Sequence, residues 1–455
     1  MMVSVLSTET AAGKRTLPPS WPVWAATAAY PLWWALGLTT VIYPLLAVVL
    51  ALRLLYMRRL KLPPGWLFWA MFLLVVVASI VMLDVDAPGT ATQSGIGPYG
   101  AYALRFLDYL CFTLLLLYVG NHSEQTLPLR SVIAAFSSLA ASVGLLGLAG
   151  TLLPTFSFRT PASYVLPEVL VGDGAARLAQ VQDILGEGAA PRPSAPFDYT
   201  NTWGEVLSMA MVWLVVYAVV FRARRKSIGL VLGLSIIPTI ASLNRGMWIG
   251  IVLTIAYVAV RLAMRLRLAL AVSIVALIAV AGGVLAISPA GELIEARLES
   301  GHSDQIRENL ANDSLRLANE SPILGFGSTR RTQGSYESIA IGPSASCSQC
   351  GERVIGSTGQ LWLLLVAQGW LGTILYFTFF AYALWTFRRD HSPAGIAASA
   401  VILLSIYYSY FYSAIGTPLA MAMLAVAMLW RSAQERSLAA EQMSTNDGEK
   451  SGLKP

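Results

Sequence analysis

Apolar side chains fill stretches of about 20 residues along nearly the whole chain, and short polar breaks separate these stretches. A helix of that length crosses the hydrocarbon core of a bilayer, which is roughly 30 Å thick. The pattern predicts about twelve membrane-spanning helices, over 21–38, 39–57, 65–83, 100–119, 131–153, 204–221, 228–243, 247–264, 268–288, 358–387, 393–413 and 416–430. Pro31, Gly37 and Pro44 favour a break between the first two of these spans. The region 21–57 therefore holds either two tilted helices or one helix with a re-entrant segment.

The predicted fold is an all-α polytopic membrane bundle with two long outer loops, 154–203 and 289–357. Its transmembrane domain covers residues 21–430. Residues 1–20 are expected to form a cytoplasmic tail and not a cleaved signal peptide, because Lys14 and Arg15 precede an apolar region that continues into the bundle. The segment 431–455 is rich in Ser, Glu, Lys and Gly, which predicts a disordered cytoplasmic tail.

Composition and charge agree with this layout. Only 12% of the residues are charged, about half the share in a soluble domain, so a soluble globular protein is excluded. The net charge of +6 suggests a nucleic-acid partner only until its distribution is considered. With the N-terminus inside, every lysine falls on the cytoplasmic side, as the positive-inside rule requires. We therefore expect no nucleic-acid partner, and we expect a multi-pass protein of the cytoplasmic membrane with both termini in the cytoplasm.

The three cysteines and three histidines are too few for a disulfide framework or a four-ligand zinc site. Cys111 lies within a predicted span and is expected to serve packing. Cys347 and Cys350 lie in the second outer loop, where an oxidising exterior favours a local disulfide, with redox chemistry or metal binding as alternatives. No nucleotide-binding glycine loop or metal-ligating carboxylate cluster stands out, so neither a metal nor another cofactor is expected.

Two places within the apolar pattern carry arginine. Arg105 either pairs with Asp108, three residues further along the same helix face, or faces a substrate cavity inside the bundle. Arg245 lies in Ser-Leu-Asn-Arg-Gly, which interrupts the apolar stretch 228–264 at its midpoint. Its guanidinium either reaches lipid phosphates at the membrane surface or is held between two helices, where its fork suits a pyrophosphate.

The second outer loop is dense in ionisable residues. Its segment 306–320 has apolar residues at partly helical spacing, which predicts an amphipathic helix lying over the bundle or a solvated loop helix. The turn 321–327, Ser-Pro-Ile-Leu-Gly-Phe-Gly, ends it. The ionisable residues of the loop include His302, Asp304, Arg307, Glu308, Asp313, Arg316, Glu320, Arg330, Arg331, Glu337, Glu352 and Arg353.

Four segments together resemble the O-antigen ligase and polymerase family of integral membrane proteins, in its ExoQ-like, actinobacterial-looking branch. They are the Pro-rich segment 193–201 ending at Asn201, the Ser-to-Gly motif around Arg245, Arg307 heading a loop helix that ends in Pro-x-x-Gly-x-Gly, and the segment 360–372. The last segment departs from the family pattern, because the family histidine falls on Thr358 and the following asparagine on Gly359.

The resemblance implies a GT-C-like glycosyltransferase that uses a polyprenyl-diphosphate-linked glycan, such as an undecaprenyl diphosphate derivative, as donor and a glycan or lipid as acceptor. It implies that Arg245 and Arg307 stabilise the diphosphate leaving group without a metal. Thr358 and His302 are candidate catalytic residues, but threonine cannot serve as the usual imidazole. Either this branch works without the histidine, or another residue such as His302 takes part, or the chain is not a ligase in the strict sense. Expected substrate-binding residues are Arg105, Asn201, Glu308, Arg316, Arg330 and Glu352.

Two other classes of function remain open. A transporter or flippase of lipid-linked glycans predicts charges along a central transmembrane cavity, whereas the predicted spans hold almost none apart from Arg105 and Asp108. That asymmetry favours the enzyme. The absent histidine leaves an inactive scaffold subunit as a further alternative.

Overall fold

The computed structural model describes residues 17–57, 59–93, 95–165, 178–183, 192–222, 224–265, 268–269, 272–273, 276, 302–333 and 353–451. These residues form a helical bundle with three small two-stranded sheets. Five helices are long and apolar enough to cross a membrane: α5 (Gly97–Gly120), α6 (Leu129–Leu152), α9 (Thr200–Phe221), α11 (Arg245–Ala263) and α15 (Gln360–Thr386). Shorter apolar helices accompany them, namely α3 (Thr39–Leu55), α4 (Trp66–Ala78) with its 3₁₀ extension Ser79–Met82, and α16 (Pro393–Tyr408). The expected span 268–288 lies outside the segments that the structure describes in full.

The N-terminal apolar region is broken where the sequence predicts. It forms α1 (Trp21–Ala26), α2 (Tyr30–Leu36) and then α3. Gly37 ends α2 with φ 78°, a left-handed conformation that glycine adopts without steric cost. The predicted division between two helical segments near Gly37 is confirmed, and the first of the two is itself made of two short helices.

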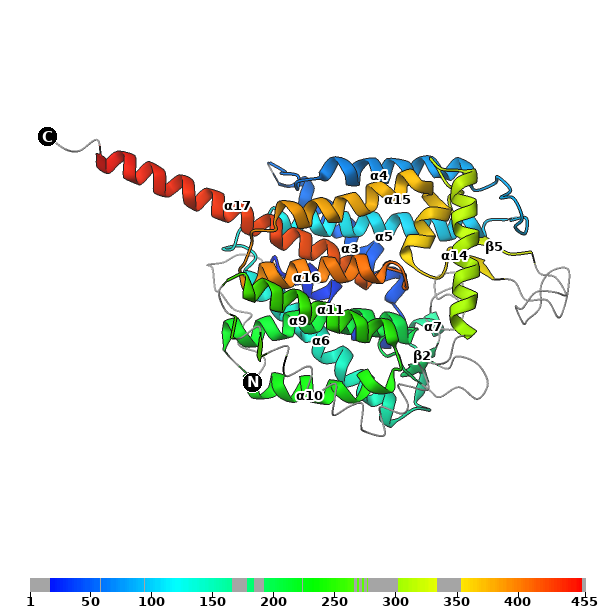
Figure 1. The fold of residues 1–455 in the computed structure, drawn as a ribbon, viewed down its shortest axis with the longest axis horizontal. Coiled ribbons are helices and arrows are strands. Elements are labelled where there is room, and N and C mark those ends of the chain that lie inside the picture. Colours follow the sequence, from blue (N-terminus) through cyan, green and yellow to red (C-terminus); the bar gives the residue numbers. More distant parts are fainter. Residues whose placement is uncertain are drawn as a thin grey trace.

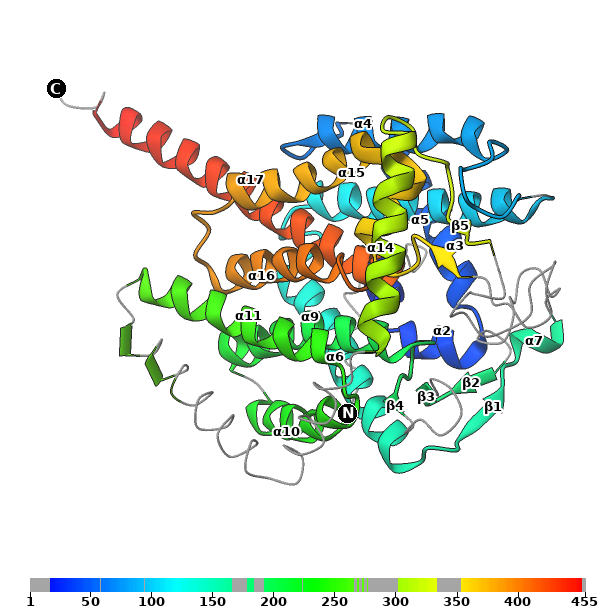
Figure 2. The same cartoon turned by 45° about the vertical axis from the view of Figure 1, so that its right-hand side comes forward.

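The bundle helices lie side by side, and α14 (His302–Glu320) lies across their ends (Figures 1 and 2). We call this the α14 end. The opposite end, which we call the basic end, carries Arg53, Lys61, Arg261, Arg388 and Arg431, and there α17 (Thr417–Ser451) leaves the bundle. The charge pattern that the sequence assigns to the cytoplasmic side thus gathers at one end of the molecule.

Three short strand pairs lie at the α14 end of the described structure. The strands β1 (Ser157–Arg159) and β2 (Leu178–Gln180) pair antiparallel, as do β3 (Gln182–Asp183) with β4 (Arg192–Pro193) and β5 (Arg330–Arg331) with β6 (Val354–Ile355). A short helix, α7 (Ala162–Val165), follows β1. These pairs tie the loop segments to the bundle where α9 and α15 begin.

Helices approach closely where small residues face large ones, as is common between membrane helices. A Cβ atom at Gly147 of α6 would lie 2.4 Å from the indole of Trp203 on α9, so glycine is required for this contact. Trp69, Phe72, Tyr109 and Tyr376 form an aromatic cluster in the core between α4, α5 and α15. The remaining helix, α10 (Arg225–Ala241), packs beside α6 and α9.

The expectation of a disordered tail from residue 431 is wrong, because α17 continues to Ser451. Arg431 binds the Glu124 carboxylate at 2.8 Å, and Arg436 binds Asp390 at 2.8 Å. Although burial by itself raises the pKa of Asp390, hydrogen bonds from Arg436 and Ser392 lower it below its ordinary value. These ion pairs extend the helix past the apolar stretch because they anchor its next turns to the connections at the basic end.

Candidate functional site

The Pro-rich segment is fixed against the bundle before it enters α9. Ser194 donates its backbone N–H to Val181 at 3.1 Å, and the Phe197 ring stacks on Tyr30 with centroids 4.9 Å apart. Helix α9 then begins at Thr200, which places Asn201, a half-buried residue, in its first turn. These contacts therefore fix the position of the start of α9 at the α14 end.

The turn between α10 and α11 meets the start of α9. Asn244 caps α11, since its side-chain oxygen accepts from the Met247 N–H at 3.0 Å, and its amide nitrogen donates to the Thr200 carbonyl at 3.4 Å. A Cβ atom at Gly204 would lie 2.7 Å from that amide nitrogen, so the approach of α9 requires glycine. Arg245 consequently stands at the first residue of α11, beside the first turn of α9.

A third segment, the connection 409–416 between α16 and α17, joins this turn. The Tyr412 hydroxyl donates to the Asn244 side-chain oxygen, and the Tyr407 hydroxyl on α16 donates to the Gly246 carbonyl at 3.2 Å. Gln360, the first residue of α15, donates its backbone N–H to the Tyr412 carbonyl at 2.8 Å. The turn that carries Arg245 thus meets α9, α16 and the connection 409–416, and this connection in turn meets the start of α15.

The turn after α14 docks into a kink of α15. Gly369 adopts φ 64° and ψ −168°, a non-helical conformation inside α15. Around this kink the carbonyls of Val366 and Ala367 accept the backbone N–H groups of Phe326 at 2.7 Å and Gly327 at 2.9 Å. Glycine is required at Gly325, because φ there is +61° and a Cβ atom would lie 2.5 Å from the Ala367 backbone. The Pro-x-x-Gly-x-Gly turn and the kinked glycine segment are therefore two halves of one joint.

This joint sets the height and direction of α14. The helix packs Leu310 and Leu317 against the bundle, with Ile306 at the edge of the same cluster, so the expected amphipathic helix over residues 306–320 is confirmed. Trp370 on α15 donates its indole N–H to the Asn319 side chain at 2.9 Å. Arg307 lies in the second turn of α14.

Arg307 acts electrostatically on Tyr412. Burial raises the pKa of the Tyr412 phenol, the carboxylate of Glu205 raises it further, and the positive charge of Arg307 lowers it. No residue in the described segments forms an ion pair with Arg307. Tyr412 therefore connects the two segments that carry the predicted arginines, because it contacts Asn244, the residue before Arg245, and lies in the field of Arg307.

Arg105 and Arg330 bind the protein itself. Arg330 is 1% exposed, and its guanidinium donates to the carbonyls of Met82, Leu83 and Val85 at 3.0–3.3 Å. Burial lowers the pKa of Arg330. These contacts give it a structural role in tying β5 to the connection that follows α4.

The expected ion pair between Arg105 and Asp108 is wrong. The Arg105 guanidinium instead donates to the Ser328 hydroxyl at 2.5 Å and to the carbonyl of Ala101 at 3.0 Å. The hydroxyl and the carbonyl lie toward the α14 end, which turns the side chain away from the carboxylate. Arg316 donates to the Pro88 carbonyl at 2.6 Å and pairs with Asp313 at 3.1 Å.

The other candidates fall into two groups. Thr358 stands just before α15, with its hydroxyl oxygen buried and without a hydrogen-bond partner, and Glu308 on α14 is exposed. His302 is the first residue of α14, and its side chain lies outside what the structure describes, as do Cys347, Cys350 and Glu352. In the described segments, no group of three or more His, Cys, Asp or Glu side chains is placed to hold a metal ion.

Reasoning from the sequence missed Tyr412 and Glu205. The carboxylate of Glu205 is 0% exposed on α9, one turn beyond Asn201. An acidic residue inside an apolar span is costly, which is the signal that points to it. Tyr412 has no such signal, because a tyrosine near a membrane surface is ordinary.

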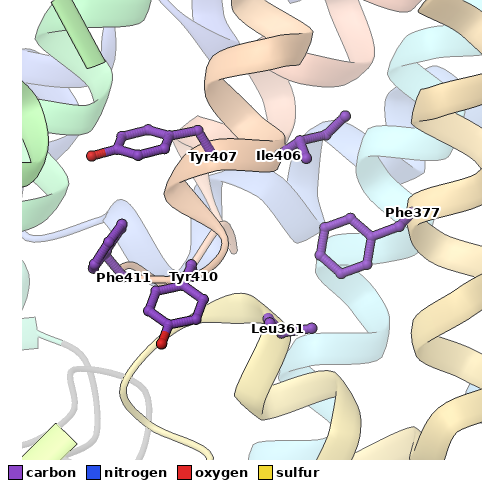
Figure 3. Close-up of a pocket in the computed structure, with 6 residues that line it drawn as sticks. All are labelled: Leu361, Phe377, Ile406, Tyr407, Tyr410 and Phe411. Carbon is purple, nitrogen blue, oxygen red and sulfur yellow. The ribbon is translucent and has the colours of Figure 1, made fainter. Parts of the chain in front are cut away.

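An apolar groove lies near the start of α15 and the end of α16 (Figure 3). Its volume is about 570 Å³. It lies between α15 and α16, and Tyr407, whose hydroxyl binds Gly246, forms part of its wall. The lining residues are Leu361, Phe377, Ile406, Tyr407, Tyr410 and Phe411.

Comparison with known proteins finds one family that part of the chain resembles. A family model described as O-antigen ligase matches residues 228–377, about a third of the chain. The match includes Arg245, Arg307 and Thr358, and it leaves out Glu205 and Tyr412. No curated protein matches the chain. Among its apolar helices, the chain thus carries a segment, residues 228–377, that is similar to the O-antigen ligase family.

Proposed function

We propose that this protein is a membrane glycosyltransferase that moves a glycan from a polyprenyl diphosphate carrier to an acceptor hydroxyl on the outer face of the cytoplasmic membrane. The acceptor is a second glycan or a lipid, so the product is a polymerised or ligated cell-surface polysaccharide. The O-antigen ligase domain supports this class of reaction. The observation that carries the proposal is that Tyr412 at the α14 end bonds to Asn244, the residue before Arg245, and also lies in the electrostatic field of Arg307.

The chemistry of the leaving group explains the two arginines. The acceptor oxygen bonds to the anomeric carbon from the opposite face, and the bond from that carbon to the diphosphate oxygen breaks with its electron pair on the diphosphate. Negative charge therefore develops at one place, where guanidinium groups that are already in position stabilise it. Arginine suits this task because its planar fork binds phosphate oxygens in pairs.

The apolar groove supports a lipid-linked donor. Each methylene of a lipid chain that leaves water contributes about 0.8 kcal/mol to binding. Tyr407 lines the groove, and its hydroxyl donates to the carbonyl of Gly246, the residue after Arg245. We therefore expect one amphiphile to bind with its diphosphate at the arginines and its chain between α15 and α16.

Arginine substitution in a strain that lacks the gene tests the proposal. We expect Arg245→Ala and Arg307→Ala each to lower glycan transfer by about 100-fold or more, since each removes charge stabilisation from the transition state. The measurement is the profile of lipid-linked and surface glycans in the complemented strains. Accumulated single lipid-linked repeats indicate a polymerase, and full-length unattached polymer indicates a ligase.

Arg159→Ala is the matched control. Arg159 also lies at the α14 end, but its guanidinium packs on the Tyr164 ring at 4.4 Å, and we expect normal transfer. Normal product from both site variants at normal protein level would contradict the assignment of the arginines. Glycans confined to the inner face of the membrane in the deletion strain would identify a flippase instead.

A further inference from the structure

A second groove lies at the basic end, at the other end of the bundle from the arginine site. Its volume is about 410 Å³, and it opens where α6 and α16 begin and where α9 ends beside α17. The proposed glycan transfer makes no use of it. Its apolar walls are formed by Leu129 and Ile133 of α6, Val220 and Phe221 of α9, Ala394 of α16 and Ala439 of α17.

The wall on α9 continues into a surface that lipid chains contact. Val215 and Val219 of this helix are 46% and 56% exposed, and Val220, which lines the groove, is 45% exposed. Since α9 is long and apolar enough to cross a membrane, we expect these exposed valines to face lipid. The groove therefore lies at the basic-end limit of a lipid-facing surface, where an acyl chain that runs along α9 reaches it directly.

Two arginines stand at the edge of this groove. The guanidinium of Arg130, the residue after Leu129, lies over the Phe221 ring at 5.1 Å from its centroid. Arg436 lines the groove with a side chain that is 52% exposed. One of its nitrogens donates to the Asp390 carboxylate at 2.8 Å, and its other N–H groups bind no residue in the described segments. Both guanidinium groups therefore have donors to offer to an anion.

The acids near the groove are already paired with arginine. Glu435 lines the groove and lies 3.6 Å from Arg431, which also binds Glu124 at 2.8 Å. Asp390 accepts from Arg436. Four further cations, all exposed, come directly after Phe221, namely Arg222, Arg224, Arg225 and Lys226. The surroundings of the groove therefore carry an excess of positive charge, which is complementary to an anionic ligand.

We propose that this groove binds one anionic phospholipid of the inner membrane leaflet, with its phosphate at Arg130 and Arg436 and its acyl chains along the apolar walls. A phospholipid joins in one molecule the two properties that the groove combines, an apolar body and an anionic head. Arginine suits the head because its planar fork binds phosphate oxygens in pairs. Basic pockets between membrane helices on the cytoplasmic side are typical sites for such head groups.

A second copy of this chain is the less suitable occupant, because two copies of this face carry charge of the same sign and repel each other. The bound lipid would connect the ends of four helices, since its neighbours come from α6, α9, α16 and α17. This inference does not depend on glycan transfer. It depends only on the chain crossing the membrane with its basic end at the inner surface.

The experiment is native mass spectrometry of the full chain, freed of lipid in detergent and titrated with dioleoyl phosphatidylglycerol or with zwitterionic dioleoyl phosphatidylcholine. We expect the wild type to bind one phosphatidylglycerol about tenfold or more tighter than phosphatidylcholine. Arg130→Glu should lower the affinity for phosphatidylglycerol by about tenfold or more, because it reverses a charge at the head group. Ala439→Trp should do the same with every charge kept, because the indole fills the space of the acyl chain.

Arg59→Glu is the matched control. Arg59 is an exposed arginine of the connection between α3 and α4 at the same end, and it does not line the groove. We expect its phosphatidylglycerol affinity to stay within about threefold of the wild type. Arg130 and Ala439 are also exposed, so neither substitution opens the core, and the lipid-free variants should unfold at the temperature of the wild type.

Four results would each overturn the site. Equal affinity for the two lipids would show that the head group is not read by charge. An equal loss in Arg59→Glu and Arg130→Glu would show attraction to the whole basic end in place of a site. Unchanged binding in Ala439→Trp would place the lipid outside the groove. A dimer in the same spectra that Ala439→Trp dissociates would identify a second copy of the chain as the occupant.

Discussion

Thr358 illustrates how much a single residue depends on its surroundings. It occupies the position at which the resembling family has histidine, and a threonine hydroxyl does not serve as a base near neutral pH. Its oxygen is buried and makes no hydrogen bond among the described residues. Arg330 and Arg307 show the same dependence, because they are the same residue type in the same outer loop. Arg330 is bound to three backbone carbonyls, whereas Arg307 acts electrostatically on Tyr412.

We predict that Thr358→Ala keeps glycan transfer within about threefold of the wild type. The hydroxyl that is lost makes no hydrogen bond among the described residues, and a threonine does not replace an imidazole as a base. Initial rates in isolated membranes, corrected for the amount of protein, measure the effect. A loss of tenfold or more would return Thr358 to the site as a participant.

The position of helix α14 is set at its C-terminal end, so the helix is displaced as a whole when that end moves. The turn 321–327 inserts into the kink of α15, and backbone hydrogen bonds to Val366 and Ala367 fix it there. The helix then extends across the bundle and carries Arg307 in its second turn. A change in the joint therefore reaches the site without altering any residue in it.

We predict that Gly325→Ala lowers glycan transfer by about tenfold or more while Arg245 and Arg307 are intact. The new methyl group would lie 2.5 Å from the Ala367 backbone, which forces the turn out of the kink and displaces α14. Gly95→Ala is the control, because φ there is also positive, +84°, but a Cβ atom would have no atom within 4 Å. If both variants lost transfer equally, the cause would be the positive φ that they share, and the contact of the turn with α15 would not control transfer.

At the scale of the whole molecule, charge and shape divide it into two ends. Arginines and lysines at the basic end bind the connections between helices, whereas the α14 end holds the arginine site and the small strand pairs. From the positive-inside rule we expect the basic end to face the cytoplasm. Polyprenyl-linked glycans would then meet the site from the outer face.

We predict that a cysteine introduced at Glu308 reacts with a membrane-impermeant maleimide in right-side-out vesicles, whereas one introduced at Lys61 reacts only after the membrane is opened. Both positions are exposed, at the α14 end and the basic end respectively. The native cysteines 111, 347 and 350 are first replaced by serine. Labelling in the opposite order would invert the topology and contradict transfer on the outer face.

The sequence by itself determined the helical segments, the break near Gly37, the amphipathic helix 306–320 and the charge of the two ends. These features follow from hydrophobic period and local charge, which neighbouring residues along the chain express together. It also singled out Arg245 and Arg307 through the motifs around them. Only the tertiary structure decided that Arg105 leaves Asp108 for Ser328, that Arg330 is structural, that α17 continues to Ser451, and that Tyr412 bonds to Asn244, the residue before Arg245. The reason is that packing between helices determines these contacts, some of which join residues more than two hundred positions apart in the sequence.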